Sequence, residues 1–272
     1  MNMEAINNIS EYIQAIQKIN STENEKKFLF YRGVKNSDYC LTPKIFRKRE
    51  PKYNEREILL DYKHYLPQLS PNYSFPEDIL KILADMQHYG IPTRLLDWTT
   101  SPLIALYFAC EVTEEKSDSK IFIFNPWKYW KRIVQEDYKI CSDIHHAHIH
   151  SRALLSFYSA KEILEIIRKK YFLELDVESL KEKKNPFPFV SSFSNDRIVI
   201  QKGCFTIHGS NQDSLECQEQ GELHKIIISK SAKSKIIEEL NLLGIDDYSV
   251  FPDYEGMRKA FERKGSLFNN KI

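Results

Sequence analysis

Proton-exchanging and hydroxyl side chains gather in one stretch of the chain, Asp85–Ala109. His88 lies beside Tyr89 near the end of a predicted helix, and a histidine can act as a general acid or base near neutral pH. A hydrogen-bonded structural role is the alternative for His88. The hydroxyl-rich segment Thr99–Ser101 directly precedes the next predicted helix. Free N–H groups at the start of a helix, next to hydroxyls, are typical of an anion site.

The middle of this stretch places opposite charges next to an aromatic ring. Arg94 and Asp97 are close enough in sequence for a local ion pair, which predicts a pinned loop between Pro92 and Pro102. Trp98 presents a flat apolar face on which a base can stack, although burial in the core is the commoner use of tryptophan. We therefore expect a partly architectural loop that forms one wall of a pocket.

A second candidate lies at the end of an early predicted strand, Phe28–Tyr31. Arg32 follows this strand and precedes Gly33. It can therefore present its planar fork to a phosphate or a carboxylate at the edge of a cleft. A structural salt bridge to a nearby aspartate is the alternative role for Arg32.

Polar residues also interrupt the predicted strands of the C-terminal half. Gln201 ends a predicted strand over 197–201, and Gly203 separates it from a second one over 204–208. A glycine at such a place indicates a bulge or a close backbone approach. Gln201 can hydrogen-bond a ligand there, and Glu222, directly before another predicted strand, is the second polar candidate.

Metal binding is not expected from this sequence. Alternate histidines of the tract at 145–150 would share one strand face, as zinc ligands can. No carboxylate or thiolate spacing completes a known metal motif, and the cysteines include no CxxC pair. A basic run over 44–56 predicts a solvated surface, with phosphate or nucleic-acid contact as the alternative.

The composition is that of a folded protein without a polyanionic bias. The chain has 272 residues, 42% hydrophobic and 12% aromatic, which favours a globular protein with a substantial core. Its 39 basic and 38 acidic side chains nearly cancel, so a nucleic-acid surface would have to be local. The N-terminus does not resemble a secretory signal, and no apolar run approaches the ~20 residues of a membrane span. We therefore expect a cytoplasmic protein with reduced thiols and no membrane partner.

Hydrophobic spacing predicts helices and strands without a regular βαβ rhythm. Isoleucines at three- and four-residue steps predict an amphipathic helix within 1–24, and residues 25–272 are expected to form one domain, with 126–195 as a candidate helical insertion. The expected fold class is α+β, with a mixed or antiparallel central sheet and surrounding helices. The other expected elements are strands over 120–124 and 223–229, helices over 55–65, 76–90, 102–115, 159–173, 232–243 and 253–264, and a loop over 181–195.

Several motifs together resemble the FRG-domain family of bacterial proteins. They are FLFYRG, LTPKIFR, MQHYGIPTRLLDWTTSPLIALYFA, IQKGCFTIHG and VFPDYEG. The family is named after a Phe-Arg-Gly signature, in which Tyr31 here replaces the phenylalanine. The resemblance runs from about Phe28 to Ala260 and implies an association with mobile elements and conflict with phage.

The order of elements is in turn similar to that of ADP-ribosyltransferases, which implies a fold of that kind and NAD as a substrate. By this resemblance Arg32, followed by Gly33, holds the NAD phosphates, and Gln201 or Glu222 takes the place of the catalytic glutamate. Gln201 departs from the pattern, because an amide cannot act as the carboxylate. The other residues implied to bind NAD are Tyr89, Thr93, Arg94, Trp98, Thr99, Thr100 and Ser101.

The leading hypothesis is therefore an ADP-ribosyltransferase-like enzyme, a toxin or phage-defence effector, with an unknown protein or nucleic-acid acceptor. The first alternative is a non-catalytic module that binds a nucleotide or nucleic acid through Arg32, Arg94 and the basic run. The second is a hydrolase or nuclease that uses His88 and Asp97. The sequence leaves the oligomeric state open.

Overall fold

The computed structural model describes most of the chain outside a long central segment. The described residues are 5–22, 29–47, 54–69, 79–111, 117–129, 132, 186–189, 196–209, 211–218 and 221–269. The histidine tract at 145–150, the helix expected over 159–173 and most of the candidate insertion therefore lie outside them. None of the described helices is both long enough and apolar enough to cross a membrane.

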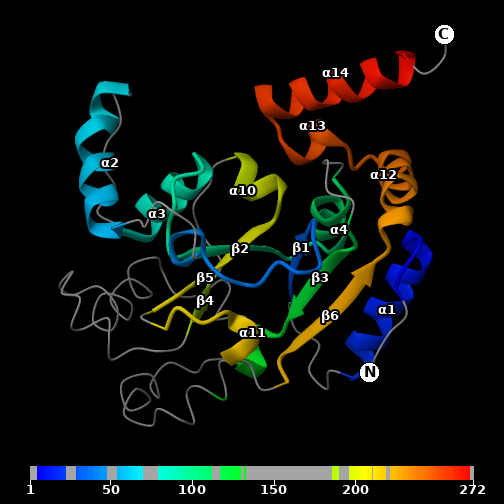
Figure 1. The fold of residues 1–272 in the computed structure, drawn as a ribbon, viewed down its shortest axis with the longest axis horizontal. Helices are drawn as coiled ribbons and strands as arrows, with labels where there is room; N and C mark the ends of the chain where they lie inside the picture. Colours follow the sequence, from blue (N-terminus) through cyan, green and yellow to red (C-terminus); the bar gives the residue numbers. More distant parts are fainter. Residues whose placement is uncertain are drawn as a thin grey trace.

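The described strands form one six-stranded sheet in the order β4-β5-β2-β1-β3-β6 (Figure 1). Every neighbouring pair in the sheet is antiparallel, which confirms the expected α+β class with an antiparallel central sheet. The strands are β1 (Phe30–Val34), β2 (Leu95–Thr99), β3 (Ser119–Phe124), β4 (Phe187–Phe189), β5 (Gly203–Ile207) and β6 (Leu223–Ile228).

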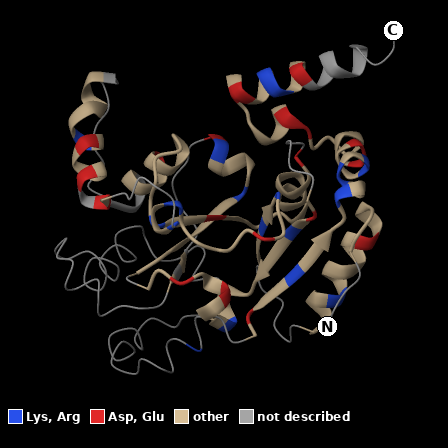
Figure 2. Cartoon of the chain, viewed as in Figure 1, with Lys and Arg blue, Asp and Glu red and all other residues tan. Residues whose placement is uncertain are grey.

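Helices surround this sheet, and most begin or end within a few residues of the predicted bounds. The longer ones are α1 (Ile9–Thr22), α2 (Glu55–Leu69), α3 (Ile79–His88), α4 (Pro102–Cys110), α12 (Lys233–Leu242) and α14 (Tyr254–Asn269). Short ones are η1 (Lys44–Phe46), α10 (Asp196–Ile200), α11 (Leu215–Gln218), η3 (Lys230–Ala232) and α13 (Asp247–Val250). Basic and acidic residues are intermingled over these elements, without a large region of one sign (Figure 2).

The sheet consists of two halves that meet at one residue pair. β1 pairs with β3 over its whole length, and β2 does the same with β5. Between β1 and β2, however, Tyr31 and Thr99 form the one paired position. β1 stays paired with β3, and β2 stays paired with β5, but β1 and β2 share no other paired position. The sheet therefore opens next to Tyr31 and Thr99. The opening is the main structural feature on which a site can be built.

Two apolar clusters hold the halves in place. One cluster packs α1, α4 and α12 against one face of β1, β3 and β6, and the other lies on the opposite face around Phe30, Trp98 and Phe124. Gly33 lets α4 approach β1, because a Cβ at this position would overlap the main-chain oxygen of Ala105. The packing of helix on sheet therefore requires a glycine after Arg32.

Three predicted element types were wrong. The segment 197–201, predicted as a strand, is helix α10, whose residues are not buried in a sheet. A short apolar run cannot be assigned to a strand or a helix from its pattern alone. β2 lies within the stretch predicted as a loop between Pro92 and Pro102, and β4 lies within the loop predicted over 181–195.

Candidate functional site

A cavity of about 850 Å³ lies where β1 and β2 part. Its lining includes Arg32 and Val34 from β1, Asp97 and Thr99 from β2, and Gln201 after α10. Arg32 and Val34 lie on one face of the sheet. Asp97 and Thr99 lie on the other, because Thr99 is paired with Tyr31 and residues directly opposite each other share a face. The volume lies within the range typical of small-molecule sites. The lining therefore includes residues from both faces of the sheet, and this cavity is our candidate site.

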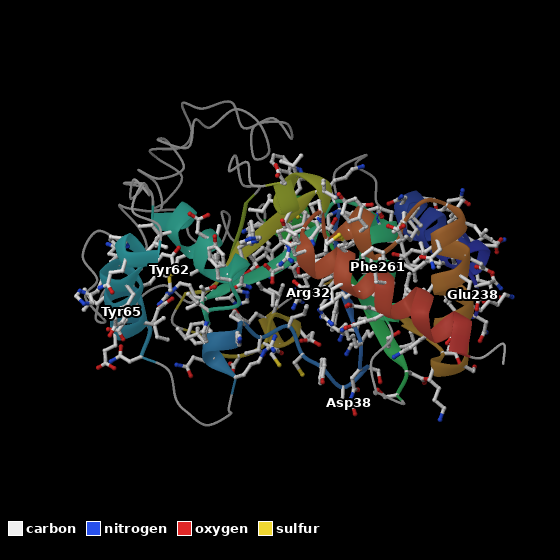
Figure 3. All side chains as sticks on the ribbon, turned by 90° about the horizontal axis from the view of Figure 1, so that it is seen from above. Arg32, Asp38, Tyr62, Tyr65, Glu238 and Phe261 are labelled. Atoms are coloured by element: carbon white, nitrogen blue, oxygen red, sulfur yellow. The ribbon has the colours of Figure 1, made fainter. Side chains whose placement is uncertain are left out.

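Arg32 lines this site, and its Nε edge has no hydrogen-bond partner among the described residues. Nη1 donates to the main-chain oxygen of Asp97 over 2.6 Å and lies 3.7 Å from its Oδ2. Nε is buried and has no hydrogen-bond partner among the described residues. Arg32 lies near the centre of the molecule, whereas Tyr65 and Glu238 lie towards its periphery (Figure 3). Burial lowers the pKa of Arg32, the Asp97 charge opposes this, and the Arg47 charge adds to it.

A relay of hydrogen bonds fixes the Asp97 carboxylate. Gln87 Nε2 donates to Asp97 Oδ2 over 2.8 Å, and Thr93 Oγ1 donates to Gln87 Oε1 over 2.6 Å. The Leu95 N–H in turn donates to Thr93 Oγ1 over 3.1 Å. The carboxylate accepts and cannot donate when ionised, so the Gln87 amide can face it only through Nε2. Thr93 is fully buried, and its role here is to orient Gln87.

The predicted ion pair between Arg94 and Asp97 was wrong. Arg94 instead pairs with Glu55 of α2, with Nε to Oε1 and Oε2 distances of 2.9 and 2.8 Å, and Nη1 donates to the His208 main-chain oxygen. Residues three apart in a strand point to opposite faces, so Arg94 and Asp97 cannot meet once the segment is extended. Arg94 is buried and does not line the cavity.

Trp98 lines the cavity from within the core. Its ring packs against Phe30 and Phe124, with centroid distances of 6.5 and 5.5 Å. Trp98 Nε1 donates to Thr206 Oγ1 over 3.1 Å, and His208 Nε2 lies 3.1 Å from the same hydroxyl. Burial lowers the pKa of His208 to about 3, and the Arg94 and Arg32 charges contribute. His208 is therefore a neutral residue of the protein interior.

Hydroxyl residues at the end of β2 and directly after it connect this strand to the turn that follows α10. Thr99 Oγ1 donates to the Gln201 main-chain oxygen over 2.6 Å, and the Ser101 N–H donates to Thr99 Oγ1 over 3.0 Å. The Thr100 N–H donates to the Lys202 oxygen, in a turn where Lys202 has a positive φ of 48°. Ser101 lies at the N-cap of α4, but its hydroxyl makes no capping bond. Of these hydroxyls, Thr99 lines the cavity.

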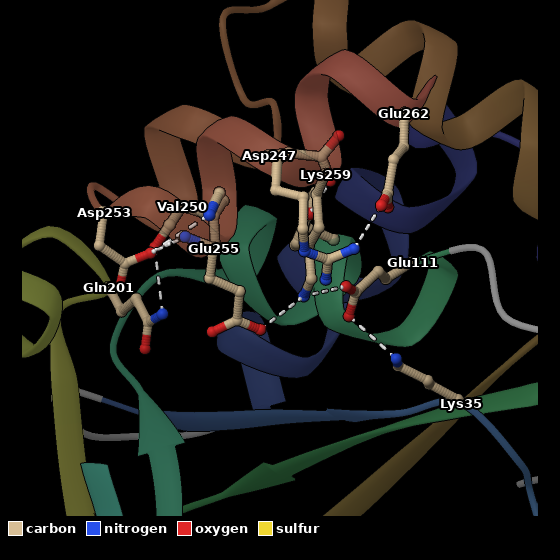
Figure 4. A network of polar contacts seen from close by, with 12 residues as sticks. Lys35, Glu111, Gln201, Asp247, Val250, Asp253, Glu255, Lys259 and Glu262 are labelled. Atoms are coloured by element: carbon tan, nitrogen blue, oxygen red, sulfur yellow. Dashed lines mark hydrogen bonds and ion pairs between the residues drawn. The ribbon is translucent and has the colours of Figure 1, made fainter. Parts of the chain in front are cut away.

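The C-terminal segment closes one side of the cavity. Gln201 Nε2 donates to the Val250 main-chain oxygen over 3.1 Å, and Phe251 lines the cavity beside it. Arg197 Nη2 contacts Asp253 Oδ2 and Glu255 Oε2 at 2.9 and 2.7 Å. The Gln201 contact with the α13 end is visible in Figure 4.

An ion-pair chain continues from this segment to β1. Lys259 Nζ lies 3.2 Å from Glu255 Oε1 and 2.7 Å from Glu111 Oε1, and Lys35 Nζ lies 3.0 Å from Glu111 Oε2 (Figure 4). His88 lines the cavity near Arg197, and its pKa is lowered by burial first and by the Arg197 charge second. His88 is therefore mostly neutral at pH 7 and can accept a proton there.

Several predicted site residues lie away from the cavity. Glu222 is 1% exposed and its Oε1 lies 2.7 Å from Arg132 Nε. Tyr89 is 69% exposed and does not line the cavity. The predicted residues that the structure brings together there are Arg32, Gly33, His88, Asp97, Trp98, Thr99 and Gln201.

Sequence reasoning did not single out three cationic residues of the cavity, Lys35, Arg47 and Arg197. Arg47 was one of many residues in the predicted basic run, so the charge alone did not distinguish it. Arg197 falls in a segment predicted as a strand, so its position in the first turn of α10, facing the cavity, was not expected. Among the described residues, no group of three or more histidine, cysteine or acidic side chains is arranged to hold a metal.

Comparison with protein-family models gives one match, and this match covers the part of the chain that carries β1, β2 and α4. Residues 27–118 match the model described as FRG domain. No curated protein and no solved structure matches the chain. The other four strands of the sheet lie after the matched residues. The predicted domain bounds of 25–272 stay a prediction.

Proposed function

We propose, since residues 27–118 of the chain form an FRG domain, that the protein is an ADP-ribosyltransferase-like enzyme that binds NAD in the cavity beside Arg32. The acceptor of the ADP-ribose would be a protein or a nucleic acid, and a toxin or phage-defence role would follow from such a transfer. Support for the proposal comes from the charge, size and shape of the cavity rather than from a matching enzyme.

The unpartnered edge of Arg32 is the observation that carries the proposal. A buried N–H without a partner costs about 1–3 kcal/mol, so such a group needs an explanation, and a bound ligand, ion or water is one. The Nε atom of Arg32 is one of these groups, and it lies on a residue that lines the cavity. A guanidinium offers two parallel N–H donors to phosphate oxygens. The pyrophosphate of NAD is a ligand of this chemistry.

The shape of the cavity supports a dinucleotide. Its volume of about 850 Å³ lies in the upper part of the usual range for ligand sites. Trp98 and Phe251 supply aromatic surface on two sides, and Arg32 supplies the cation between the two sheet halves. A nucleotide with planar rings and a charged centre matches this distribution.

Transfer of ADP-ribose requires a negative group near the ribose. The bond between ribose C1′ and the nicotinamide nitrogen breaks, its electron pair leaves with nicotinamide, and the acceptor bonds to C1′ and releases a proton. Positive charge develops on the ribose in between, and a preorganised carboxylate stabilises it. In the cavity Asp97 supplies a carboxylate oriented by Gln87, while Gln201 supplies a neutral polar group. Glu222 is distant from this chemistry in its buried pair with Arg132.

The test is nicotinamide release from NAD, measured with wild type, Arg32→Ala and Arg32→Lys. We expect turnover in the wild type, a loss of about 100-fold or more in Arg32→Ala and a partial loss in Arg32→Lys, because lysine lacks the fork. Arg258→Ala is the matched control, since Arg258 pairs with Glu262 on the surface of α14. Absence of NAD turnover, alone and with protein and nucleic-acid acceptors, would contradict the proposal.

Nucleotide binding without catalysis is the second candidate function. The polar group that follows α10 supports it, because Gln201 is an amide and its Nε2 already donates to the Val250 oxygen. Binding of NAD that depends on Arg32 but gives no nicotinamide would favour this candidate. Release of ADP-ribose into water would instead indicate hydrolysis, for which His88 and Asp97 lie in the same cavity.

A further inference from the structure

The cationic side chains that line the cavity differ in how closely carboxylates of the protein pair with them. Arg32, Lys35, Arg47 and Arg197 all line it. Lys35 pairs with Glu111 at 3.0 Å, and Arg197 pairs with two carboxylates of the C-terminal segment. Arg47 forms no ion pair with any described residue, and Arg32 has one long contact, at 3.7 Å. The charge available to a ligand therefore resides mainly on Arg32 and Arg47.

The main chain holds Arg47 in its place at the cavity. Arg47 follows η1, whose Ile45 N–H donates to the Thr93 oxygen over 3.4 Å, and Lys44 Nζ donates to the Gly90 oxygen over 2.7 Å. Arg47 Nε donates to the Thr42 oxygen over 3.2 Å. Its two terminal nitrogens have no acceptor among the residues that the structure describes. The side chain is thus anchored at Nε and presents its two terminal nitrogens, which have no acceptor among the described residues, at its end.

Arg32 and Arg47 are close enough for their charges to interact. The Arg47 charge contributes to the lowered pKa of Arg32, after burial and against the effect of Asp97. Two like charges that face one cavity repel each other unless a counter-charge lies between them. An anion that contacts both guanidiniums would remove this repulsion and satisfy the open edge of Arg32.

We infer that Arg47 is a second anion-binding residue and that the cavity takes a ligand with two adjacent phosphate groups, one at Arg32 and the other at Arg47. The inference rests on the proposed function for the ligand class, nucleoside diphosphates and their esters, but it requires no turnover. By this inference Arg32 of β1 contacts one phosphate and Arg47, directly after η1, contacts the other. A ligand with one phosphate would leave one of the two arginines without its counter-charge.

The test compares ADP, AMP and inorganic pyrophosphate as probes by isothermal titration calorimetry. With wild type we expect ADP to bind about tenfold or more tightly than AMP, because a charge-assisted contact is lost with the second phosphate. Arg47→Ala is expected to weaken ADP and pyrophosphate about tenfold and to change AMP by less than about twofold. The ADP affinity of Arg47→Lys should lie between those of the wild type and Arg47→Ala, since lysine keeps the charge but lacks the planar guanidinium that can donate two parallel hydrogen bonds.

Arg258→Ala is the control for this experiment. Arg258 is exposed on α14, pairs with Glu262 and does not line the cavity, so ADP affinity should stay at the wild-type value. Thermal unfolding of each variant checks that the fold is kept, which the exposed position of Arg47 favours. Equal affinities for ADP and AMP, equal effects of Arg47→Ala and Arg258→Ala, or no binding of any probe would each overturn the inference.

The outcomes separate this inference from the proposed enzyme activity. ADP binding that depends on Arg47, without nicotinamide release from NAD, would sustain the inference and contradict the proposed function. If Arg47→Ala changed neither nicotinamide release nor ADP affinity, the proposed function would stand and the inference about Arg47 would be contradicted.

Discussion

Arg32 Nη1 donates to the main-chain oxygen of Asp97, so an arginine of one sheet half is bonded to the strand of the other half at the point where the two separate. The contact leaves the Nε edge of Arg32 unpartnered among the described residues and places the Asp97 carboxylate within 3.7 Å of the same guanidinium. Cation and carboxylate are thereby held in one cavity by elements more than sixty residues apart in sequence.

Removal of the Asp97 charge tests its assigned role in transfer. We expect Asp97→Asn to lower kcat for nicotinamide release about 100-fold and to leave KM for NAD within about threefold, because the charge acts on the developing cation and not on the bound phosphates. Steady-state kinetics give both values. Gln87→Leu should lower kcat less, since it removes the 2.8 Å bond that orients Asp97 but keeps the carboxylate. An unchanged kcat in Asp97→Asn would exclude the role.

The close approach of α4 to β1 predicts a severe effect of any side chain at Gly33. A Cβ there would overlap the Ala105 oxygen and lie 2.6 Å from the Ala109 nitrogen. Gly33→Ala should therefore lower the free energy of unfolding by about 3 kcal/mol or more. Gly90→Ala is the control, because Gly90 has a φ of 74° and open space around it, so the backbone cost alone of about 1–2 kcal/mol is expected. Urea denaturation measures both, and similar losses would argue against the packing explanation.

The buried pair of Arg94 and Glu55 predicts an asymmetric response to substitution. Arg94→Met should destabilise the protein by about 3 kcal/mol, because it leaves a largely buried carboxylate without its partner. The double variant Arg94→Met with Glu55→Leu should recover part of this loss. Lys235→Ala, which breaks an exposed pair with Glu239, should cost less than about 1 kcal/mol. Denaturant titrations test the series, and a double variant less stable than Arg94→Met would contradict the explanation.

The buried neutral His208 predicts loss of stability in acid. Its folded-state pKa is about 3, below the ordinary value of 6.5, so between these values the unfolded chain binds a proton that the folded protein does not. The free energy of unfolding should therefore fall as the pH drops from 6.5 towards 3, with a contribution of about 1.4 kcal/mol per pH unit at most. Urea denaturation across this range measures the slope. His208→Asn should reduce it, and an unchanged slope would assign the effect to other groups.

Local patterns predicted much of the fold. The isoleucine spacing of α1, the strand at β3, the strand at β6 and the helix at α12 all lie where hydrophobic periodicity placed them. These elements each bury one regular stripe, so their pattern carries the information. α10 was predicted as a strand. Its Ile-Val-Ile run is compatible with a strand or a short helix, so the pattern alone could not decide between them.

The candidate site was predictable only in part. Arg32 and Gln201 were placed at ligand-facing positions from their neighbours, and both line the cavity. Glu222 fitted the chemistry from its residue type, but its partner Arg132 lies 90 residues away, and no local pattern indicates this pair. The pairing of Arg94 with Glu55 across 39 residues is a similar case.

The sequence alone determined which segments are apolar enough to form the sheet and its covering helices, and that a glycine and an arginine adjoin at the end of β1. Tertiary structure decided how the strands join. Because β1 and β2 share one paired position while each keeps a full partner on its other side, the sheet opens at Arg32 and the cavity follows from that opening. Strand pairing depends on contacts between residues distant in sequence, so the cavity and its charges could not be read from the spacing of residues along the chain.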